Sequence, residues 1–395
     1  MEGEMYYYTS TDTMCKILQN GNMFATNLNY MNDAQEYVNG LKEIRNLCLD
    51  KDFVRNEYPE NIDGVTNRMI EALKNEMTEE NLSEYMKTNT RYSISFCKDG
   101  DLLSQWTTYA RESGVSIQMF FEKDREICFK FYNAAPGAEE TPKIKCFAHP
   151  REILYLTKGR GDDYKDIGGK VLHRMFPEGY QEGDTDTKLS ETWKENSVYI
   201  KQYDFYQEKE YRIAFDYMKL NEGDGWPRID YRTEKHVIKP YLDVECENGW
   251  PVISVMVGPG FNQQVVYRSV KFFLDHAQIR SSRLYSRKHW GEQIKRYLTE
   301  TLSTVPSGYK AGEQTTNEKE WTDKRKKLLN ICSSLIEDPG YDEKLDESEQ
   351  NKLYEMVREL SHMYFAIEEK ENESVAPYFS KSGIILKCSQ IPYIY

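Results

Sequence analysis

The sequence lacks the residue clusters that usually mark a disulfide framework or a metal site. Its eight cysteines are scattered singly and form no C-x-x-C pair, which predicts reduced, buried thiols. Its six histidines are equally dispersed and include no H-E-x-x-H motif, so no metal is predicted. A nucleotide-binding glycine loop is missing too, because GRGDDYKDIGGK at 159–170 fits neither G-x-G-x-x-G nor G-x-x-x-x-G-K. We predict instead that this stretch belongs to an exposed excursion over 159–186.

Long apolar runs are also absent. No stretch approaches the ~20 consecutive apolar residues that a membrane-spanning helix requires. The first residues, MEGEMYYYTS, are acidic and lack the apolar core of a signal peptide, so we expect a cytoplasmic protein. The formal net charge of −13 disfavours binding to extended nucleic acid.

The patterns that are present indicate an α+β fold. Short alternating segments rich in β-branched and aromatic residues predict strands, for example at 5–9, 91–96 and 114–121. Apolar residues at helical spacing predict helices at 11–20 and 65–86. We therefore predict a split mixed or antiparallel β-sheet that is flanked by helices.

The chain changes character towards its C-terminal end. Two amphipathic helical patterns, at 321–336 and 353–367, follow each other there, and the last residues revert to a strand pattern. We predict a main α+β domain at 1–286, a helical insertion at 287–380 that could bind a protein partner, and a terminal strand at 381–395 that returns to the main sheet.

Four segments are richer in polar and aromatic groups than packing requires. They are YYYTS at 6–10, YMNDAQEY at 30–37, LLSQWTTYA at 102–110 and YQEKEYRIAF at 206–215. On a strand, Glu208, Glu210 and Arg212 would project to one face, as an ion-pair cluster or as carboxylates aimed into a cleft. Taken singly, the segments are most simply explained as a capped strand, a polar turn before a helix, core aromatics and a solvated edge.

The order of these segments resembles a bacterial family, the domain of unknown function number 2971. In that family an aromatic opening strand, an Asn-Asp-x-x-Glu turn, a Trp-x-x-Tyr-Ala helix and a Glu-x-Glu-aromatic-Arg strand follow one another. The resemblance continues through VISVMVGPG to CSQIPY, and it covers roughly 5–273 and 384–395.

The opening segment also resembles the ADP-ribosyltransferase superfamily, which implies an ADP-ribosyltransferase-like fold and NAD as substrate. In strand alternation Tyr7 and Thr9 share one face, with Tyr6 and Tyr8 behind it. Tyr7 stands where that superfamily has a ribose-binding histidine, and Thr9 stands at its hydroxyl position. The late glutamate of the superfamily corresponds to Glu208 or Glu210, and Glu210 is preferred because Tyr211 and Arg212 follow it.

The resemblance implies a set of site residues. The catalytic candidates are Glu210, Glu208 and Tyr7. Trp106 or Tyr109 would stack on nicotinamide, and the wider set for NAD binding is Tyr8, Thr9, Asn32, Asp33, Ser104, Trp106, Tyr109 and Arg212.

Two functions follow from these candidates. The first is an NAD-consuming transferase or NAD hydrolase, in which a carboxylate stabilises the positive charge that develops on the ribose. By resemblance, such an enzyme would be a toxin or a phage-defence effector. The second is a non-catalytic module of the same fold that binds a nucleotide or a protein partner. The sequence leaves the acceptor and the oligomeric state open.

Overall fold

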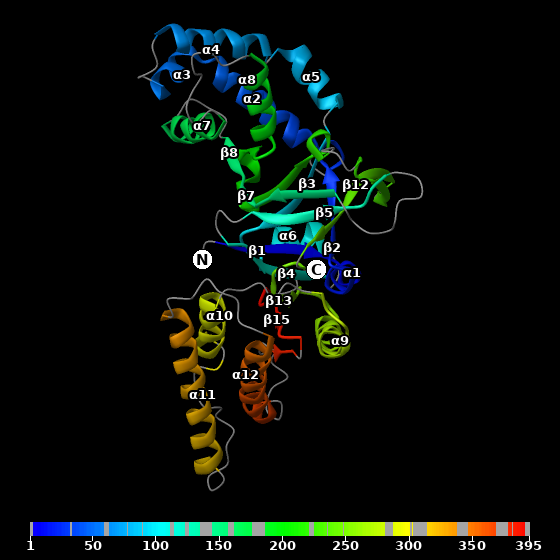
Figure 1. Ribbon diagram of the computed structural model, residues 1–395, viewed down its shortest axis with the longest axis vertical. Helices are drawn as coiled ribbons and strands as arrows, with labels where there is room; N and C mark the ends of the chain where they lie inside the picture. Colours follow the sequence, from blue (N-terminus) through cyan, green and yellow to red (C-terminus); the bar gives the residue numbers. More distant parts are fainter. Residues whose placement is uncertain are drawn as a thin grey trace. The chain divides into compact units, whose positions relative to one another are not determined.

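The computed structural model has an α+β architecture and divides into two compact units (Figure 1). Unit 1 comprises Met1–Gly21, Asp99–Lys123 and Asn248–Tyr395, and unit 2 comprises Asn22–Lys98 and Asp124–Glu247. The predicted main domain at 1–286 is thus shared between the two units. The structure describes residues 3–31, 34–58, 63–76, 78–88, 90–110, 114–122, 126–134, 144–156, 162–175, 186–220, 225–234, 236–247, 249–280, 287–300, 302, 314–337, 347–368, 378–380 and 382–391.

The sheet of unit 1 contains the first and the last strands of the described chain. Its strands run in the order β14 (Tyr378–Phe379), β15 (Ile385–Cys388), β13 (Val252–Val257), β4 (Val115–Phe120) and β1 (Glu4–Thr9). All neighbours are antiparallel except β13 and β15, which are parallel. The strand expected at the C-terminal end therefore corresponds to β15 and lies within this sheet.

The helices of unit 1 include one whose sequence signals are complete. In α1 (Thr11–Asn20), the Ser10 hydroxyl accepts a hydrogen bond from the Thr13 N–H, and Gly21 ends the helix at φ 80°. The other helices are α6 (Leu103–Tyr109), α9 (Gln263–His276), α10 (Arg287–Glu300), α11 (Gln314–Glu337) and α12 (Glu347–Glu368).

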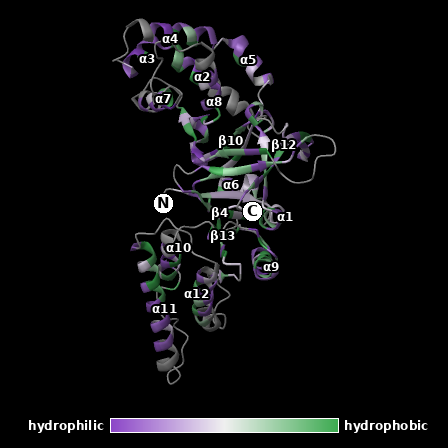
Figure 2. Cartoon of the chain, in the orientation of Figure 1, coloured by the Kyte–Doolittle hydropathy of each residue, from purple (hydrophilic) through white to green (hydrophobic). Residues whose placement is uncertain are grey.

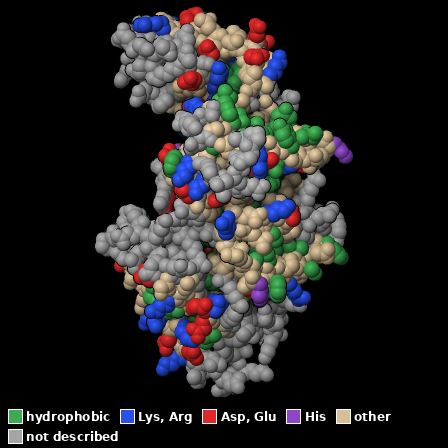
Figure 3. Space-filling model, turned by 45° about the vertical axis from the view of Figure 1, so that its right-hand side comes forward, with side chains coloured by type: hydrophobic (Ala, Val, Ile, Leu, Met, Phe, Trp, Pro, Cys, Tyr) green, Lys and Arg blue, Asp and Glu red, His purple; other side chains and the backbone are tan. Residues whose placement is uncertain are grey.

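The helices α10, α11 and α12 share an apolar core with the edge of the unit 1 sheet. Leu298, Trp321, Leu328 and Val357 are buried in this core together with Ile385 of β15. Acidic and basic side chains are interleaved over the outer surface of this helical block, at the bottom of the view (Figure 3).

The sheet of unit 2 is antiparallel. Its main path is β3 (Arg91–Cys97), β2 (Asn22–Asn27), β12 (Val237–Cys246), β5 (Ile127–Phe131) and β6 (Ile144–Ala148). Beyond that path, β10 (Glu210–Asp216) pairs with β3 and with β7 (Arg151–Glu152), and β11 (Ile229–Glu234) pairs with β12. A separate parallel pair joins β8 (Leu154–Leu156) to β9 (Ile200–Gln202).

Unit 2 has a helical subcore of its own. Its helices are α2 (Ala34–Leu49), α3 (Lys51–Glu57), α4 (Asp63–Glu76), α5 (Glu79–Thr88), α7 (Asp162–Met175) and α8 (Asp186–Ser197), with the 3-10 turns η1 (Leu28–Tyr30), η2 (Tyr203–Glu208) and η3 (Tyr217–Leu220). Leu47, Val54, Leu73 and Trp193 from these helices are buried together with Leu156 of β8. Apolar and polar stripes alternate on the described helices, as Figure 2 shows, because one side of each helix faces the core.

Three local predictions differ from the structure. The excursion predicted at 159–186 contains the helix α7, of which Val171 and Leu172 are fully buried. The single stripe at 65–86 falls on two helices, α4 and α5. A helix does follow the polar segment at 30–37, but it begins as early as Ala34, and Asn32 and Asp33 lie outside the described residues. None of the described helices is long and apolar enough to cross a membrane.

Candidate functional site

The residues predicted to form one cleft belong to both units. Tyr7, Tyr8, Thr9, Ser104, Trp106 and Tyr109 lie in unit 1, and Glu208, Glu210 and Arg212 lie in unit 2. That the two groups meet in one cleft stays a prediction.

Within unit 1 the aromatic residues of β1 and α6 do not all face the same side of the strand. Trp106 packs edge-on against Tyr8, with ring centroids 4.7 Å apart. The Tyr8 hydroxyl donates to the Asp99 carbonyl and accepts from the Leu102 N–H, each at 2.9 Å. Because side chains alternate along a strand, Trp106 lies on the face opposite to Tyr7 and Thr9. The expectation that Trp106 accompanies Tyr7 and Thr9 is therefore wrong, and Tyr8 is its partner.

The helix α6 carries the remaining candidates of unit 1 on different sides. Trp106 is buried and its indole N–H donates to the Asp101 carboxylate at 2.7 Å. Ser104 and Tyr109 are exposed. Trp106 thus anchors α6 to unit 1, and a ring that could stack on a ligand at this helix would have to be Tyr109.

In unit 2 the predicted carboxylates belong to an ion-pair cluster, which we call the carboxylate cluster: Lys201, Glu208, Glu210 and Arg212. Glu208 is half-buried, and the other three residues are buried. The Lys201 ammonium lies 2.7 Å from a Glu208 oxygen and 3.1 Å from a Glu210 oxygen. Arg212 donates from Nε to Glu210 Oε1 at 2.5 Å and from Nη2 to Oε2 at 3.1 Å. Arg212 also donates to the Val198 carbonyl at 2.9 Å. Lys201, Glu210 and Arg212 are each at most 5% exposed.

The position of Glu208 corrects one detail of the sequence interpretation. Glu208 ends η2 and does not belong to β10, which begins at Glu210. Between them Lys209 adopts a left-handed conformation with φ 44°. Glu208 and Glu210 both contact the Lys201 ammonium, and Glu210 also contacts Arg212. The three predicted side chains therefore meet through Lys201, and not because they alternate along one strand.

The carboxylate cluster holds Glu210 in its ionised form. Burial alone would raise the pKa of the Glu210 carboxyl, but the opposing charges of Arg212 and Lys201 lower that pKa to about 2. Both oxygens are hydrogen-bonded or ion-paired. Glu210 in this state cannot donate a proton near neutral pH, and its carboxylate is occupied by its neighbours.

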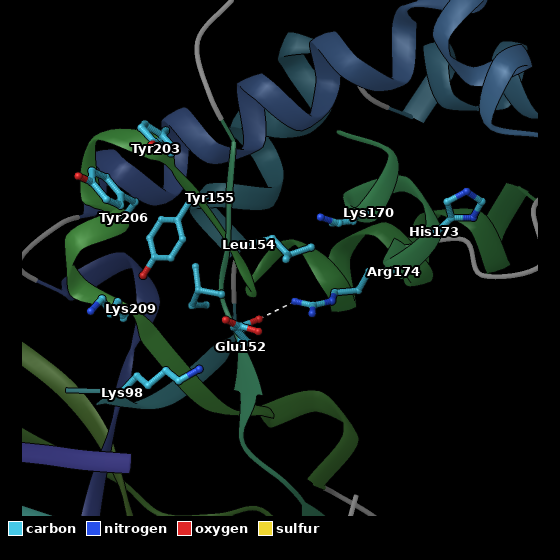
Figure 4. Close-up of a pocket in the computed structure, with 11 residues that line it drawn as sticks. Lys98, Glu152, Leu154, Tyr155, Lys170, His173, Arg174, Tyr203, Tyr206 and Lys209 are labelled. Atoms are coloured by element: carbon cyan, nitrogen blue, oxygen red, sulfur yellow. Dashed lines mark hydrogen bonds between the residues drawn. The ribbon is translucent and has the colours of Figure 1, made fainter. Parts of the chain in front are cut away.

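A pocket of about 970 Å³ lies in unit 2 beside the carboxylate cluster (Figure 4). It is lined by Lys98, Glu152, Ile153, Leu154, Tyr155, Lys170, His173, Arg174, Tyr203, Tyr206 and Lys209. These residues come from the end of β3, from β7 and β8, from α7 and from η2 with the residue that follows it. Its volume is typical of pockets that hold cofactor-sized ligands.

Aromatic rings form one side of this pocket. Tyr203 and Tyr206 of η2 are stacked on each other, with centroids 4.7 Å apart and planes inclined by 10°. They are 39% and 45% exposed, so the stacked pair is open to a ligand. Tyr155 lies beside them, and its hydroxyl oxygen accepts a hydrogen bond from the Glu210 N–H at 2.7 Å. Tyr155 therefore connects the pocket directly to the carboxylate cluster.

Four basic side chains also line the pocket: Lys98, Lys170, Arg174 and Lys209. Lys98 directly follows β3 and Lys209 directly precedes β10. The Lys98 N–H donates to the Lys209 carbonyl at 2.9 Å, and both side chains are exposed. On α7, Lys170 pairs with Asp166 at 2.7 Å, and Arg174 donates to the Glu152 carbonyl at 2.5 Å. In a chain of net charge −13, such a concentration of cations favours an anionic ligand.

Glu152 is the single carboxylate among the described lining residues. It is exposed in β7, and Figure 4 places it between Lys98 and Arg174. Within the described part of the chain its carboxylate forms no ion pair. It is therefore available to a ligand in a way that Glu210 is not.

Sequence reasoning identified the carboxylate cluster but missed most of this lining. Tyr206 lies within the segment YQEKEYRIAF, whereas Tyr203 precedes it and Glu152 and Tyr155 lie in a segment interpreted only as a strand. The available signal was the spacing of Tyr203 and Tyr206, which puts two rings on one face of a helical turn.

Neither the described residues nor the comparisons with known proteins identify a ligand for this site. No cluster of three or more potential metal ligands occurs among the described residues. Comparisons with family models, with curated proteins and with solved structures gave no match to this chain.

Proposed function

We propose that unit 2 binds a nucleotide-type ligand in the pocket formed by β7, β8, α7 and η2. The observation that carries this proposal is the combination of the stacked pair Tyr203 and Tyr206 with Lys98 and Lys209 in one pocket. A planar base can stack on the outer face of a tyrosine ring, and phosphate oxygens accept hydrogen bonds from lysine ammonium groups.

NAD is the nucleotide that we propose first, because the sequence resembles ADP-ribosyltransferases. The coarse α+β class supports an ADP-ribosyltransferase-like fold as part of the same proposal. The ligand would place a base against Tyr206, its diphosphate near Lys98 and Lys209, and ribose hydroxyls within reach of Glu152. A carboxylate accepts hydrogen bonds from a pair of ribose hydroxyls without needing a change of protonation.

The binding test measures the Kd for NAD, ADP-ribose and ATP by titration calorimetry. Lys98→Gln and Lys209→Gln should each weaken binding about tenfold, because each removes one charge-assisted hydrogen bond. Tyr206→Phe should keep most of the affinity and Tyr206→Leu should lose about tenfold, since only the ring provides stacking.

The matched control is Lys219→Gln. Lys219 is an exposed lysine of unit 2 that pairs with Glu195 and does not line the pocket. Equal Kd values for Lys219→Gln, Lys98→Gln and Lys209→Gln, or no measurable binding of any nucleotide to the unaltered protein, would refute the proposal.

Cleavage of NAD is the second candidate, and the position of Glu152 in the pocket favours it. As the nicotinamide–ribose bond breaks, positive charge develops on the ribose, and a nearby carboxylate stabilises that charge. We propose Glu152 for this role, ahead of Glu208 and Glu210, because the pocket lining includes Glu152 and neither of the other two.

Nicotinamide release, followed by chromatography, distinguishes the two candidates. If the protein cleaves NAD, Glu152→Gln should reduce release at least a hundredfold while leaving the Kd for NAD within about threefold. Binding of NAD without release would identify a non-catalytic nucleotide-binding module. A toxin or phage-defence role remains part of the enzymatic proposal only.

A further inference from the structure

An exposed stripe with large apolar side chains runs along the helix α9 of unit 1. Apart from the polar residue Asn262, the exposed positions from 261 to 276 form what we call the α9 stripe: Phe261, Val265, Arg268, Ser269, Phe272 and His276. Phe261, Val265 and Phe272 are 81%, 65% and 66% exposed. Apolar side chains that are exposed singly need no explanation, whereas a contiguous series indicates an interaction site.

The helical period keeps the members of the α9 stripe in line. Val265, Arg268 and Phe272 are spaced by three and four residues, so their side chains lie along one side of the helix. Phe261 lies in the turn that leads into α9, and His276 ends the helix with its ring stacked on Phe272, the centroids 4.2 Å apart. The stripe is therefore roughly 20 Å long, at a rise of about 1.5 Å per residue.

The opposite side of α9 is fixed to the rest of unit 1. Val270 and Leu274 are buried there, and the helix packs on β13 and β15 (Figure 1). The Lys271 ammonium lies 4.1 Å from the centroid of the Tyr378 ring, and the Tyr378 hydroxyl donates to an Asp275 oxygen at 2.9 Å. Because these contacts set the rotation of the helix, the α9 stripe faces solvent in the single chain.

The α9 stripe is complementary to itself when two copies of the helix lie antiparallel. Reversal about the midpoint between positions 268 and 269 exchanges 261 with 276, 265 with 272 and 268 with 269. The six positions of the stripe are therefore the same after the reversal. This alignment places Phe261 against His276 of the second copy, and Val265 against Phe272 of the second copy. Such a surface forms an isologous interface, the arrangement of two-fold symmetric dimers.

The midpoint of the α9 stripe permits two helices to approach each other. Ser269 is small, and its hydroxyl donates to the Val266 carbonyl of its own helix at 2.9 Å. In the antiparallel alignment it faces Arg268 of the second copy, whose alkyl stem can cross the serine while the guanidinium reaches solvent. The stripe contains no Asp or Glu although the chain has a net charge of −13. Two copies can therefore meet here without bringing carboxylates together.

We propose that the α9 stripe is the contact surface of a two-fold symmetric homodimer, in which the α9 helices of two copies pack antiparallel. Association removes the exposed Phe261, Val265 and Phe272 side chains of both copies from water, and this burial drives it. One helix pair makes a small interface, so we expect a dimer that exchanges with the monomer. The surface belongs to unit 1 and is independent of the nucleotide pocket of unit 2.

Sedimentation velocity over a range of roughly 1 to 200 μM protein measures this association. The average mass of the unaltered protein should rise across that range from one chain towards two. Phe272→Ser should raise the dimer Kd at least about tenfold, because each ring takes part in one of two symmetric contacts. Phe147→Ser is the matched control: Phe147 is 60% exposed on β6 of unit 2, and its loss should leave the Kd within about twofold. Lys98→Gln should also leave it unchanged.

Disulfide formation tests the alignment of the two helices. Ser269→Cys places two thiols beside the two-fold axis and should cross-link under mild oxidation. Ser334→Cys is the matched control, because Ser334 is also an exposed serine on a helix of unit 1 whose hydroxyl donates within its own helix; it should cross-link at least about tenfold more slowly. A mixture of Val265→Cys and Phe272→Cys should form the mixed disulfide, whereas Val265→Cys alone should not, since its two copies lie about 10 Å apart along the axis.

Three outcomes would overturn the homodimer. They are a single chain at the highest concentration, a dimer whose Kd is the same for Phe272→Ser and Phe147→Ser, and equal cross-linking of Ser269→Cys and Ser334→Cys. Sedimentation with vesicles of phosphatidylcholine and phosphatidylglycerol adds a further arm. Vesicle binding that Phe272→Ser abolishes, in a protein that stays monomeric, would assign the α9 stripe to a membrane surface instead.

Discussion

The carboxylate cluster of unit 2 allows a quantitative prediction for Glu210→Gln. Glu210 is 5% exposed and neutralises Arg212 through two hydrogen bonds, while Lys201 has Glu208 as a second partner. In the Glu210→Gln variant, the neutral amide leaves the Arg212 guanidinium buried without a counterion, whereas Lys201 keeps Glu208. Breaking one partner of a buried ion pair in this way typically costs about 3–5 kcal/mol of unfolding free energy.

The lowered pKa of Glu210 also makes this interaction depend on pH. The pKa of Glu210 falls from an ordinary value of 4.5 to about 2 in the folded protein, which corresponds to about 3 kcal/mol. Because the folded pKa is the lower one, this stabilisation is fully present above pH 4.5. It decreases as the pH falls and disappears once the pH has passed through about 2.

Urea unfolding, followed by far-ultraviolet circular dichroism, measures both quantities. Glu210→Gln should lose about 3 kcal/mol at pH 7, and at pH 3 its deficit relative to the unaltered protein should shrink to about half or less. Glu195→Gln is the matched control, because Glu195 forms an exposed ion pair with Lys219, and it should cost under about 0.5 kcal/mol. A loss below about 1 kcal/mol at pH 7, or a deficit that is the same at pH 7 and pH 3, would refute the structural role of Glu210.

Three further predictions concern local features. Ser10→Ala should cost about 1 kcal/mol in urea unfolding, because the Ser10 hydroxyl caps α1, and Ser10→Thr should keep most of that stability. Trp106→Phe should cost about 1–2 kcal/mol by removing the indole N–H that donates to the Asp101 carboxylate; an unchanged unfolding midpoint would contradict this. Burial and Glu247 raise the pKa of the Cys128 thiol to about 11, so its alkylation rate should climb about fiftyfold between pH 9 and pH 11, whereas a rise of only about twofold would show an ordinary thiol.

Local signals predicted those elements whose causes are local. The helix α1 was predictable because Ser10 caps its start, Gly21 stops it, and Met14, Ile17 and Leu18 fall on its buried face. The helix α7 was not, because its glycines suggested an exposed loop. A β-carbon on Gly168 would lie 2.8 Å from the Leu47 side chain, so this glycine permits close packing between helices, which no local pattern reveals.

The candidate site was predictable only in part for a similar reason. Residue type and spacing indicated that Glu208, Glu210 and Arg212 would meet, and they do. The left-handed conformation of Lys209 and the arrival of Lys201 from β9 depend on tertiary structure. The pocket itself combines ends of strands with α7 and η2, and the distance between these segments along the chain hides their proximity.

The segmented make-up of unit 1 also has a consequence for how the protein is made on the ribosome. The strand β4 ends at Phe120, but its neighbour β13 begins only at Val252, about 130 residues later. At a synthesis rate of about 5–20 residues per second, one edge of β4 would wait roughly 6 to 26 s for its partner. The second segment of unit 2, Asp124–Glu247, is translated in that interval and completes that unit, whereas the nascent unit 1 presents an unpaired strand edge that a chaperone would have to shield.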